Sequence, residues 1–86
     1  MDEPPQTTIT KGPEKRTTKH RIKIRFESSE PGSSYMCKLD KGAYKTCNSP
    51  FKKRVGEGRH KFSVFAIDAA GNADQTPAKV KFRVVD

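Results

Sequence analysis

The chain contains two cysteines, Cys37 and Cys47, which enclose the polar segment CKLDKGAYKTC. Two thiols placed this way can act as metal ligands, as a redox pair or as a disulfide. A zinc site would need two more ligands, and His20 and His60 stand far off without metal-ligand spacing. Redox pairs normally have the C-x-x-C spacing at the start of a helix. We therefore expect a structural disulfide, which is typical of oxidising compartments outside the cytosol. Two free thiols are the remaining alternative.

The expected disulfide would close a hairpin that turns at residues 41–43. A turn there places Cys37 opposite Cys47, and a directly opposed, non-hydrogen-bonded pair brings side chains close enough to bridge. The same register places Lys45 opposite Leu39, facing inward, and a bulge near the turn would remove this conflict. Closing the loop should stabilise the domain by about 3 kcal/mol on the chain-entropy model.

A second group of candidate ligands lies in the loop DAAGNAD, where Asp68, Asn72 and Asp74 offer spaced oxygen atoms to a calcium ion. The alternative is a turn in which Gly71 supplies a positive φ and the side chains of Asp68 and Asn72 bond loop backbone. The surrounding positive potential also disfavours a bound cation, so we favour the turn. We expect no metal and no cofactor.

The remaining reactive side chains do not suggest a catalytic set. Both cysteines are assigned to the disulfide, and His60, at the start of a strand, is expected to be tied to nearby backbone. The ten acidic residues are scattered, without paired carboxylates. The tripeptide GEG lacks the context of a phosphate-binding loop. We therefore expect no enzymatic activity.

The elements that position these residues are all predicted strands. In RIKIRFES, apolar residues from Ile22 to Phe26 alternate with cations, and a period of two is typical of a half-buried antiparallel strand. Turn residues separate the runs that we expect as strands, which are residues 7–11, 21–27, 34–39, 43–46, 51–55, 59–68 and 78–85. The sequence predicts an all-β, seven-stranded antiparallel sandwich, Ig-like or fibronectin III-like, with one short-range disulfide. We expect a linker at residues 1–6 and a single domain at 7–86.

Size and charge limit the possible functions. Eighty-six residues, 31% of them hydrophobic, make one small domain with a thin core. The net charge of +8 favours contact with polyanions: nucleic acid, acidic glycans or anionic membrane surfaces. No apolar run approaches transmembrane length, and the acidic, proline-rich start MDEPPQTTIT is unlike a signal peptide. If the protein is exported, we expect its signal to be absent from this sequence and Met1 to be an added start.

The positive charge falls on two predicted outer faces. On the face formed by residues 34–39, 59–68 and 78–85, Phe65 and Ile67 also point outward, and a cationic sheet with an aromatic residue could bind a polyanion. The candidate residues are Lys38, Lys61, Phe65, Lys79, Lys81 and Arg83. The other face carries Arg21, Lys23, Arg25, Lys52 and Arg54. We favour the simpler interpretation that both faces are solvated and keep the domain soluble and its edge strands unpaired, since any half-buried strand would show this alternation with lysine.

The run GEGRHKFSVFAIDAAGNADQTPA resembles the G-x-H-x-F-x-V-x-A-x-D-x-A-G-N-x-D-x-T-P-A signature of bacterial Ig-like repeat modules. The stretches PPQTTITKGP and SSEPGSSYMCKLDKGAYKTCNSP fit the same family in the same order, so the resemblance extends from Pro4 to Val84. It implies an Ig-like sandwich, a bridge between Cys37 and Cys47, and a spacer or binding module without catalysis. The chain departs from the family at Lys53, where an apolar or aromatic residue is common, and in its more basic outer positions.

Together these features predict a non-catalytic structural, adhesion or spacer module of a secreted or cell-surface bacterial multidomain protein, located outside the cell. The expected partners are neighbouring modules of the same chain, with an acidic polysaccharide or other polyanion as a further candidate. We expect no membrane span and a monomeric isolated domain. The alternative function is that of a polyanion-binding domain that uses the basic sheet face.

Overall fold

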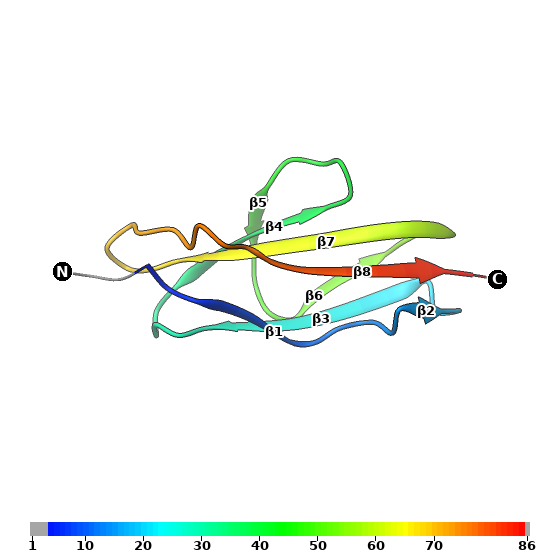
Figure 1. Cartoon of the computed structure of the whole chain (residues 1–86), viewed down its shortest axis with the longest axis horizontal. Coiled ribbons are helices and arrows are strands. Elements are labelled where there is room, and N and C mark those ends of the chain that lie inside the picture. Colours follow the sequence, from blue (N-terminus) through cyan, green and yellow to red (C-terminus); the bar gives the residue numbers. More distant parts are fainter. Residues whose placement is uncertain (1–3, 86) are drawn as a thin grey trace.

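The computed structural model describes residues 4–85, which form eight strands and no helix (Figure 1). The strands are β1 (Thr7–Lys11), β2 (Arg16–Thr17), β3 (Arg21–Ser28), β4 (Ser34–Leu39), β5 (Lys45–Cys47), β6 (Phe51–Arg54), β7 (Gly58–Ile67) and β8 (Ala78–Val84). They make a three-stranded sheet, β1-β3-β6, and a five-stranded sheet, β2-β8-β7-β4-β5. The prediction of an all-β fold is confirmed. In the described range no helix has the length and apolarity that crossing a membrane requires.

Seven of the strands lie where the sequence pattern predicted them, with ends that differ by at most two residues. The prediction of a seven-stranded, purely antiparallel fold is wrong in one respect, because β2 is an additional strand that pairs in parallel with β8. Arg16 lies opposite Arg83 and Thr17 opposite Val84. A strand of two residues has no alternation to detect, since the period-two signal needs at least four residues.

The inner faces of both sheets supply the hydrophobic core. Its buried members are Ile22, Ile24, Phe26, Cys37, Val55, Phe62, Val64, Phe82 and Val84. Phe26 packs edge-to-face on Tyr35 with ring centroids 4.9 Å apart, and Phe51 packs on Phe62 at the same centroid distance. Along β3 every second residue is buried, so the intervening cations face solvent.

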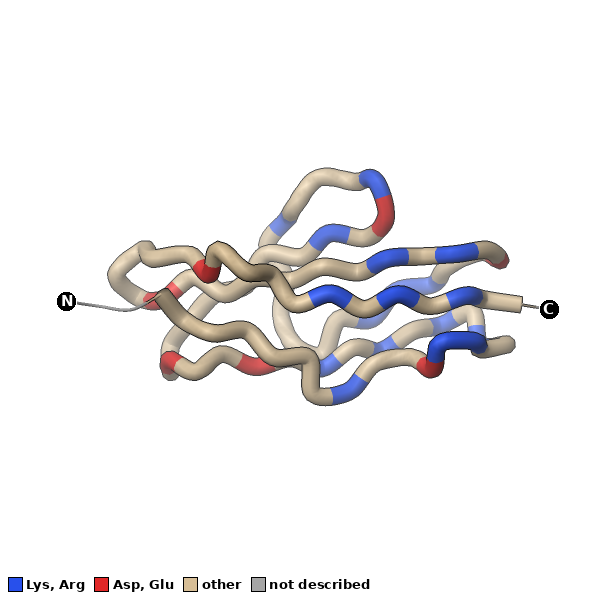
Figure 2. The backbone as a smooth tube through the Cα atoms, viewed as in Figure 1, with Lys and Arg blue, Asp and Glu red and all other residues tan. Residues whose placement is uncertain are grey.

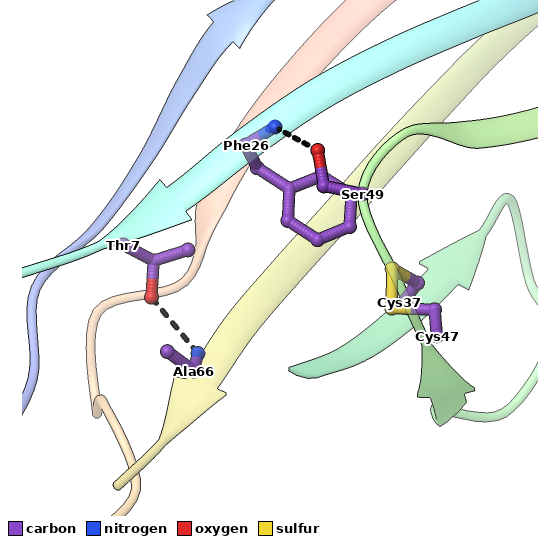
Figure 3. The surroundings of a disulfide bond; sticks show 6 residues. All are labelled: Thr7, Phe26, Cys37, Cys47, Ser49 and Ala66. Carbon is purple, nitrogen blue, oxygen red and sulfur yellow. Dashed lines mark hydrogen bonds between the residues drawn. A yellow bond between two sulfur atoms is a disulfide. The ribbon is translucent and has the colours of Figure 1, made fainter. Parts of the chain in front are cut away.

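Thr7 of β1 joins the two sheets by hydrogen bonds (Figure 3). Its Oγ1 accepts the backbone N–H of Ala66 in β7 at 2.9 Å and donates to Oδ2 of Asp74 at 2.7 Å. The buried Asp74 carboxylate also accepts the backbone N–H of Thr7 and two hydrogen bonds from Thr76. Burial raises the pKa of Asp74, but the hydrogen bonds from Thr7 and Thr76 outweigh it and lower the pKa. The ionised form is therefore the one that holds this contact.

A serine completes the hydrogen bonding of β3 where its partner strand ends. Strand β6 pairs with β3 only as far as Ile24, which lies opposite Phe51. The next inward-facing residue, Phe26, donates its backbone N–H to Oγ of Ser49 at 3.0 Å (Figure 3). Ser49 precedes Pro50 through a cis peptide bond in the connection from β5 to β6.

Cys37 and Cys47 form the predicted disulfide, with their Cα atoms 5.8 Å apart (Figure 3). The predicted register of the hairpin is wrong by two residues. Cys47 lies opposite Tyr35, and Cys37 lies opposite Lys45, so the bridge joins diagonal neighbours rather than a directly opposed pair. This shift takes Lys45 away from Leu39 and leaves it exposed on the edge strand β5. No bulge is needed, because the conflict that called for one does not arise.

The segment predicted as a linker packs onto the domain in its second half. Residues 1–3 lie outside the described residues, as does residue 86. Pro5 is buried, the backbone N–H of Ser29 donates to the carbonyl oxygen of Gln6, and the backbone N–H of Gln6 donates to Oγ of Ser29, both at 2.9 Å. Within the described residues, Pro5 and Gln6 therefore belong to the folded domain rather than to a linker.

Reduction of the disulfide is expected to lower the free energy of unfolding by about 3 kcal/mol, because the open chain gains loop entropy in the unfolded state. Urea unfolding of the oxidised and reduced protein measures the difference. The control is the Cys37→Ala/Cys47→Ala variant, whose unfolding should not respond to the reductant. Equal stability of the oxidised and reduced wild-type protein would contradict the expectation.

Candidate polyanion-binding face

The outer face of the five-stranded sheet carries rows of directly opposed cations. Lys61 of β7 lies opposite Lys81 of β8, and Arg59 lies opposite Arg83. Arg83 also pairs with Arg16 of β2, so three arginines lie side by side across three strands. All five side chains are exposed. Like charges in directly opposed positions destabilise a sheet, here on the order of 0.5 kcal/mol per pair.

A further row on this face contains two lysines separated by a small residue. Ser63 of β7 lies between Lys79 of β8 and Lys38 of β4, and it is only 2% exposed although it faces outward. Nζ of Lys38 lies 5.0 Å from the centre of the Tyr44 ring, which is a cation–π contact. We call the face formed by Arg16, Lys38, Arg59, Lys61, Lys79, Lys81 and Arg83 the five-strand face.

The aromatic residue predicted for this face, Phe65, is half-buried against a second aromatic ring. Phe65 packs edge-to-face on Tyr44, with ring centroids 4.9 Å apart. Tyr44 belongs to the connection between β4 and β5, which projects from the sheet (Figure 1). Phe65 is thus one half of an aromatic pair beside Lys38. Tyr44 was not predicted as part of the face, because the sequence does not reveal where the hairpin turn folds.

An open hollow of about 860 Å³ lies among the cation rows. It is lined by Lys15, Asp40, Lys41, Arg59, His60, Lys61, Lys81, Phe82 and Arg83. Three of the predicted residues, Lys61, Lys81 and Arg83, meet here, whereas Lys38, Phe65 and Lys79 do not line the hollow. Arg59 could have been predicted, since it precedes Lys61 in the same alternation. Lys15 and Lys41 come from irregular segments and give no such signal.

Within residues 4–85 no Lys or Arg lies within 4.0 Å of a carboxylate oxygen, and the one ion pair is between His60 and Asp40. All eighteen Lys and Arg residues of the chain fall in this range. They are also segregated, because residues 4–10, 26–37 and 62–78 contain neither Lys nor Arg. Figure 2 shows the result: the half of the molecule toward the C-terminal end is rich in cations, and the opposite end is not. Neighbouring acids therefore do little to offset the repulsion between the cations.

His60, at the border of the hollow, is held between two hydrogen-bond acceptors. Nδ1 lies 2.7 Å from Oδ2 of Asp40, and Nε2 lies 2.7 Å from the carbonyl oxygen of Gly56. Because both partners accept, both ring nitrogens are best used as donors, which favours the imidazolium. The hydrogen bond to Asp40, followed by that to Gly56, raises the pKa of His60. The tie to backbone was expected, but Asp40 was not predicted as a partner.

Asp40 is fixed by the strand that also carries His60. Its Oδ1 accepts the backbone N–H of Lys61 at 2.9 Å, and its own N–H donates to the carbonyl oxygen of Lys61 at 2.7 Å. Partial burial raises the pKa of Asp40, but the hydrogen bonds from His60 and Lys61 outweigh it and lower the pKa. Asp40 has a φ of 57°, a left-handed conformation that Asp tolerates better than most residues.

The loop that was considered for calcium is a hydrogen-bonded turn. Asp68 accepts two backbone N–H groups of the loop, one of them that of Asn72, and the Asn72 side-chain amide as well. These bonds, with the Asn72 backbone first, lower the pKa of Asp68. Gly71 has the predicted positive φ, 90°. Asp74 bonds instead to residues outside the run, and residues 4–85 contain no group of three His, Cys, Asp or Glu side chains placed to hold a metal ion.

No protein-family model matches the chain, and comparison with curated proteins gives no significant match. The interpretation of the five-strand face therefore depends on its own geometry and charge. Rows of exposed cations beside an aromatic pair provide several contacts for an extended anion.

The pair of Asp40 and His60 is expected to make stability depend on pH. Because the pKa of His60 is raised in the folded state, His60 contributes to the free energy of unfolding. This contribution is fully present below the unfolded value of 6.5 and is lost as the pH rises through the folded pKa. Because the pKa of Asp40 is lowered, its contribution is present above 3.8 and is lost as the pH falls through the folded pKa. The Asp40 side chain is 41% exposed, so we expect a loss of up to about 1 kcal/mol above pH 6.5.

Urea unfolding at a series of pH values measures this dependence, with His60→Gln as the comparison. His20 is present in both proteins, so the difference between the two profiles reports His60. The profile of the variant should be flatter above pH 6.5. Identical profiles for the wild type and the variant would show that the pair does not contribute.

Proposed function

We propose that the chain is an Ig-like, non-catalytic module of a secreted or cell-surface multidomain protein, in which it acts as a spacer or display unit. The strand order supports the Ig-like assignment. Strands β1, β3 and β6 correspond to A, B and E of the immunoglobulin sandwich, and β8, β7, β4 and β5 correspond to G, F, C and C′. The short strand β2 beside β8 extends this arrangement without changing it.

The observation that carries the proposal is the position of the two chain ends. The domain measures 49 × 22 × 17 Å, and its first and last described residues lie at opposite ends of the long axis (Figure 1). Domains joined through such ends extend in line, each adding its own length. This is the geometry that a spacer needs, because length then increases with every module.

The disulfide supports a location outside the cytosol, since such bonds form and persist in oxidising compartments. The position of the disulfide also matters for a spacer that has to bear mechanical load. Cys47 is the last residue of β5, just before the chain crosses from the five-stranded sheet to β6 of the three-stranded sheet. The bridge to Cys37 on β4 therefore anchors the crossing covalently to the core.

A second function, binding of an acidic polysaccharide, is supported by the five-strand face. Its opposed pairs, Lys61 with Lys81 and Arg59 with Arg83, lower stability in the free domain. An anionic polymer lying across the rows would remove the repulsion and release counterions. A module can perform both functions, because the rows of cations lie on the outer surface of the five-stranded sheet.

The spacer proposal is tested with a protein of two copies joined in tandem, the segment preceding Thr7 serving as the connection. We expect small-angle X-ray scattering to give a maximum dimension near twice the 49 Å long axis of one domain. Thermal unfolding of the single domain and the tandem protein should coincide if the modules fold independently. A compact, folded-back particle would argue against the spacer.

The polysaccharide proposal is tested with Lys81→Glu, which places an acid opposite Lys61. We expect the free energy of unfolding to rise by about 0.5 kcal/mol, because a repulsive pair becomes an attractive one. Heparin binding should weaken, with the slope of log affinity against log salt reduced by about 1 to 2. Isothermal titration calorimetry at rising salt measures the second effect.

Lys19→Glu is the matched control, because it changes the net charge equally at an exposed position outside the five-strand face. It should alter heparin binding less than Lys81→Glu does. If both variants weaken binding equally, binding follows net charge alone and the face has no special role. Since Lys81→Glu should stabilise the domain while it weakens binding, unfolding cannot account for the result.

A further inference from the structure

The outer face of the three-stranded sheet repeats the arrangement of opposed cations. Arg21 of β3 lies opposite Arg54 of β6, and Lys23 lies opposite Lys52. We call the face formed by Lys11, Arg21, Lys23, Arg25, Lys52 and Arg54 the three-strand face. Its third row pairs Arg25 of β3 with Lys11 of β1. All six side chains are exposed, and the rows lie directly beside one another along β3.

Acids are absent from the rows of this face. Among the residues of β1, β3 and β6, the one acid is Glu27, which lies opposite Thr8 beyond the last cation row. The pKa of Lys23 is lowered by the charge of Arg25 first and then by that of Lys52. A second open hollow, of about 480 Å³, lies over the β3–β6 pair. It is lined by Arg21, Ile22, Lys23, Lys52, Lys53 and Arg54.

The two cationic faces point in opposite directions. Ile22 and Ile24 on the inner side of β3 and Phe62 and Val64 on the inner side of β7 all belong to one buried core, so the outer sides of the two sheets lie on opposite surfaces of the domain. Packed sheets are about 10 Å apart. A short, rigid anionic segment that lies flat on one face therefore does not reach the other. The two faces are therefore separate surfaces.

The chemistry of the three-strand face favours an anionic polysaccharide over nucleic acid. Recognition of single strands uses exposed aromatic rings on which bases stack, and the residues of this face are all Lys or Arg. Reading a duplex uses an element that enters a groove, whereas this face is a sheet surface. Sulfate or carboxylate groups on a flexible sugar chain need only point charges at intervals, which the rows provide.

We propose that the three-strand face is a second site for an acidic polysaccharide, so that one domain links two polymer chains. The inference rests on the polysaccharide binding proposed above for the five-strand face and adds a second, independent face to it. A module with two opposed binding faces would cross-link an anionic polymer network as well as space its neighbours. Cross-linking requires both faces, whereas binding requires only one.

The test uses three variants of the whole chain that each remove two exposed positive charges. Lys23→Gln/Lys52→Gln removes one opposed pair of the three-strand face, and Lys61→Gln/Lys81→Gln removes one opposed pair of the five-strand face. Lys19→Gln/Lys45→Gln removes two charges that belong to neither face. All three have the same net charge. Circular dichroism and thermal unfolding confirm that each variant is folded before binding is measured.

Two measurements separate binding from cross-linking, both near 0.15 M salt. Calorimetry with a heparin oligosaccharide too short to span both faces counts the sites on the domain. Turbidity and dynamic light scattering with long-chain heparin report cross-linking. We expect two sites and cross-linking for the wild type and for Lys19→Gln/Lys45→Gln, and one strong site without cross-linking for each face variant.

Three results would overturn the inference. If wild type has one site, which only the Lys61→Gln/Lys81→Gln variant loses, the five-strand face binds alone and the proposed function stands without the second site. If all three variants weaken binding equally, attraction is diffuse and neither face is a site. If the wild type does not bind the oligosaccharide at all, the proposed polysaccharide binding fails together with the inference.

Discussion

Burial of the inner side chains fixes the register of the strands, and the register decides where every charge lies. Phe62 of β7 lies opposite Val80 on the inner face, so Lys61 must lie opposite Lys81 on the outer face. A shift of the register by one residue would expose the inner side chains of the strand to water. Burying a phenylalanine contributes about 2 to 3 kcal/mol, several times the roughly 0.5 kcal/mol by which an opposed cation pair destabilises the sheet. The core therefore imposes the cation rows, and the strands cannot slide to relieve them.

One contact that ties the two layers together is placed away from this repulsion. Thr7, Ala66 and Asp74 form their hydrogen-bonded contact within segments that contain no Lys or Arg. In the cationic half, polar contacts include that of His60 with Asp40 and Gly56, and that of His20 with the carbonyl oxygen of Val55. The buried carboxylate of Asp74 therefore lies in the segments without cations, whereas the titratable pair of His60 and Asp40 lies among the cations.

The sequence predicted the features that depend on alternation and missed those that depend on where irregular segments fold. The strands, the disulfide and the turn at Gly71 follow from local patterns. The hairpin register could not be predicted, because one turn residue more or less shifts the pairing of Cys37. Contacts between distant segments, such as Tyr44 on Phe65, leave no local signal. Lys53 stands where the resembled family commonly has an apolar or aromatic residue. It lies opposite the buried Ile22, yet its side chain is exposed because β6 is an edge strand.

A purely solvated surface would not need this charge pattern. Solubility requires net charge, and acids interspersed among the lysines would supply attractive cross-strand pairs as well. Instead, Lys61 with Lys81 and Lys23 with Lys52 oppose like charges on two faces, with no acid between them. The free domain is therefore less stable than its fold allows, and the repulsion that lowers its stability lies on its most exposed surfaces. A polyanion bound there would supply the missing negative charge, and because it binds the folded rows and not the unfolded chain in this arrangement, it would raise the stability of the domain. The electrostatic cost of the free state and the proposed affinity for an anionic polymer then have the same origin.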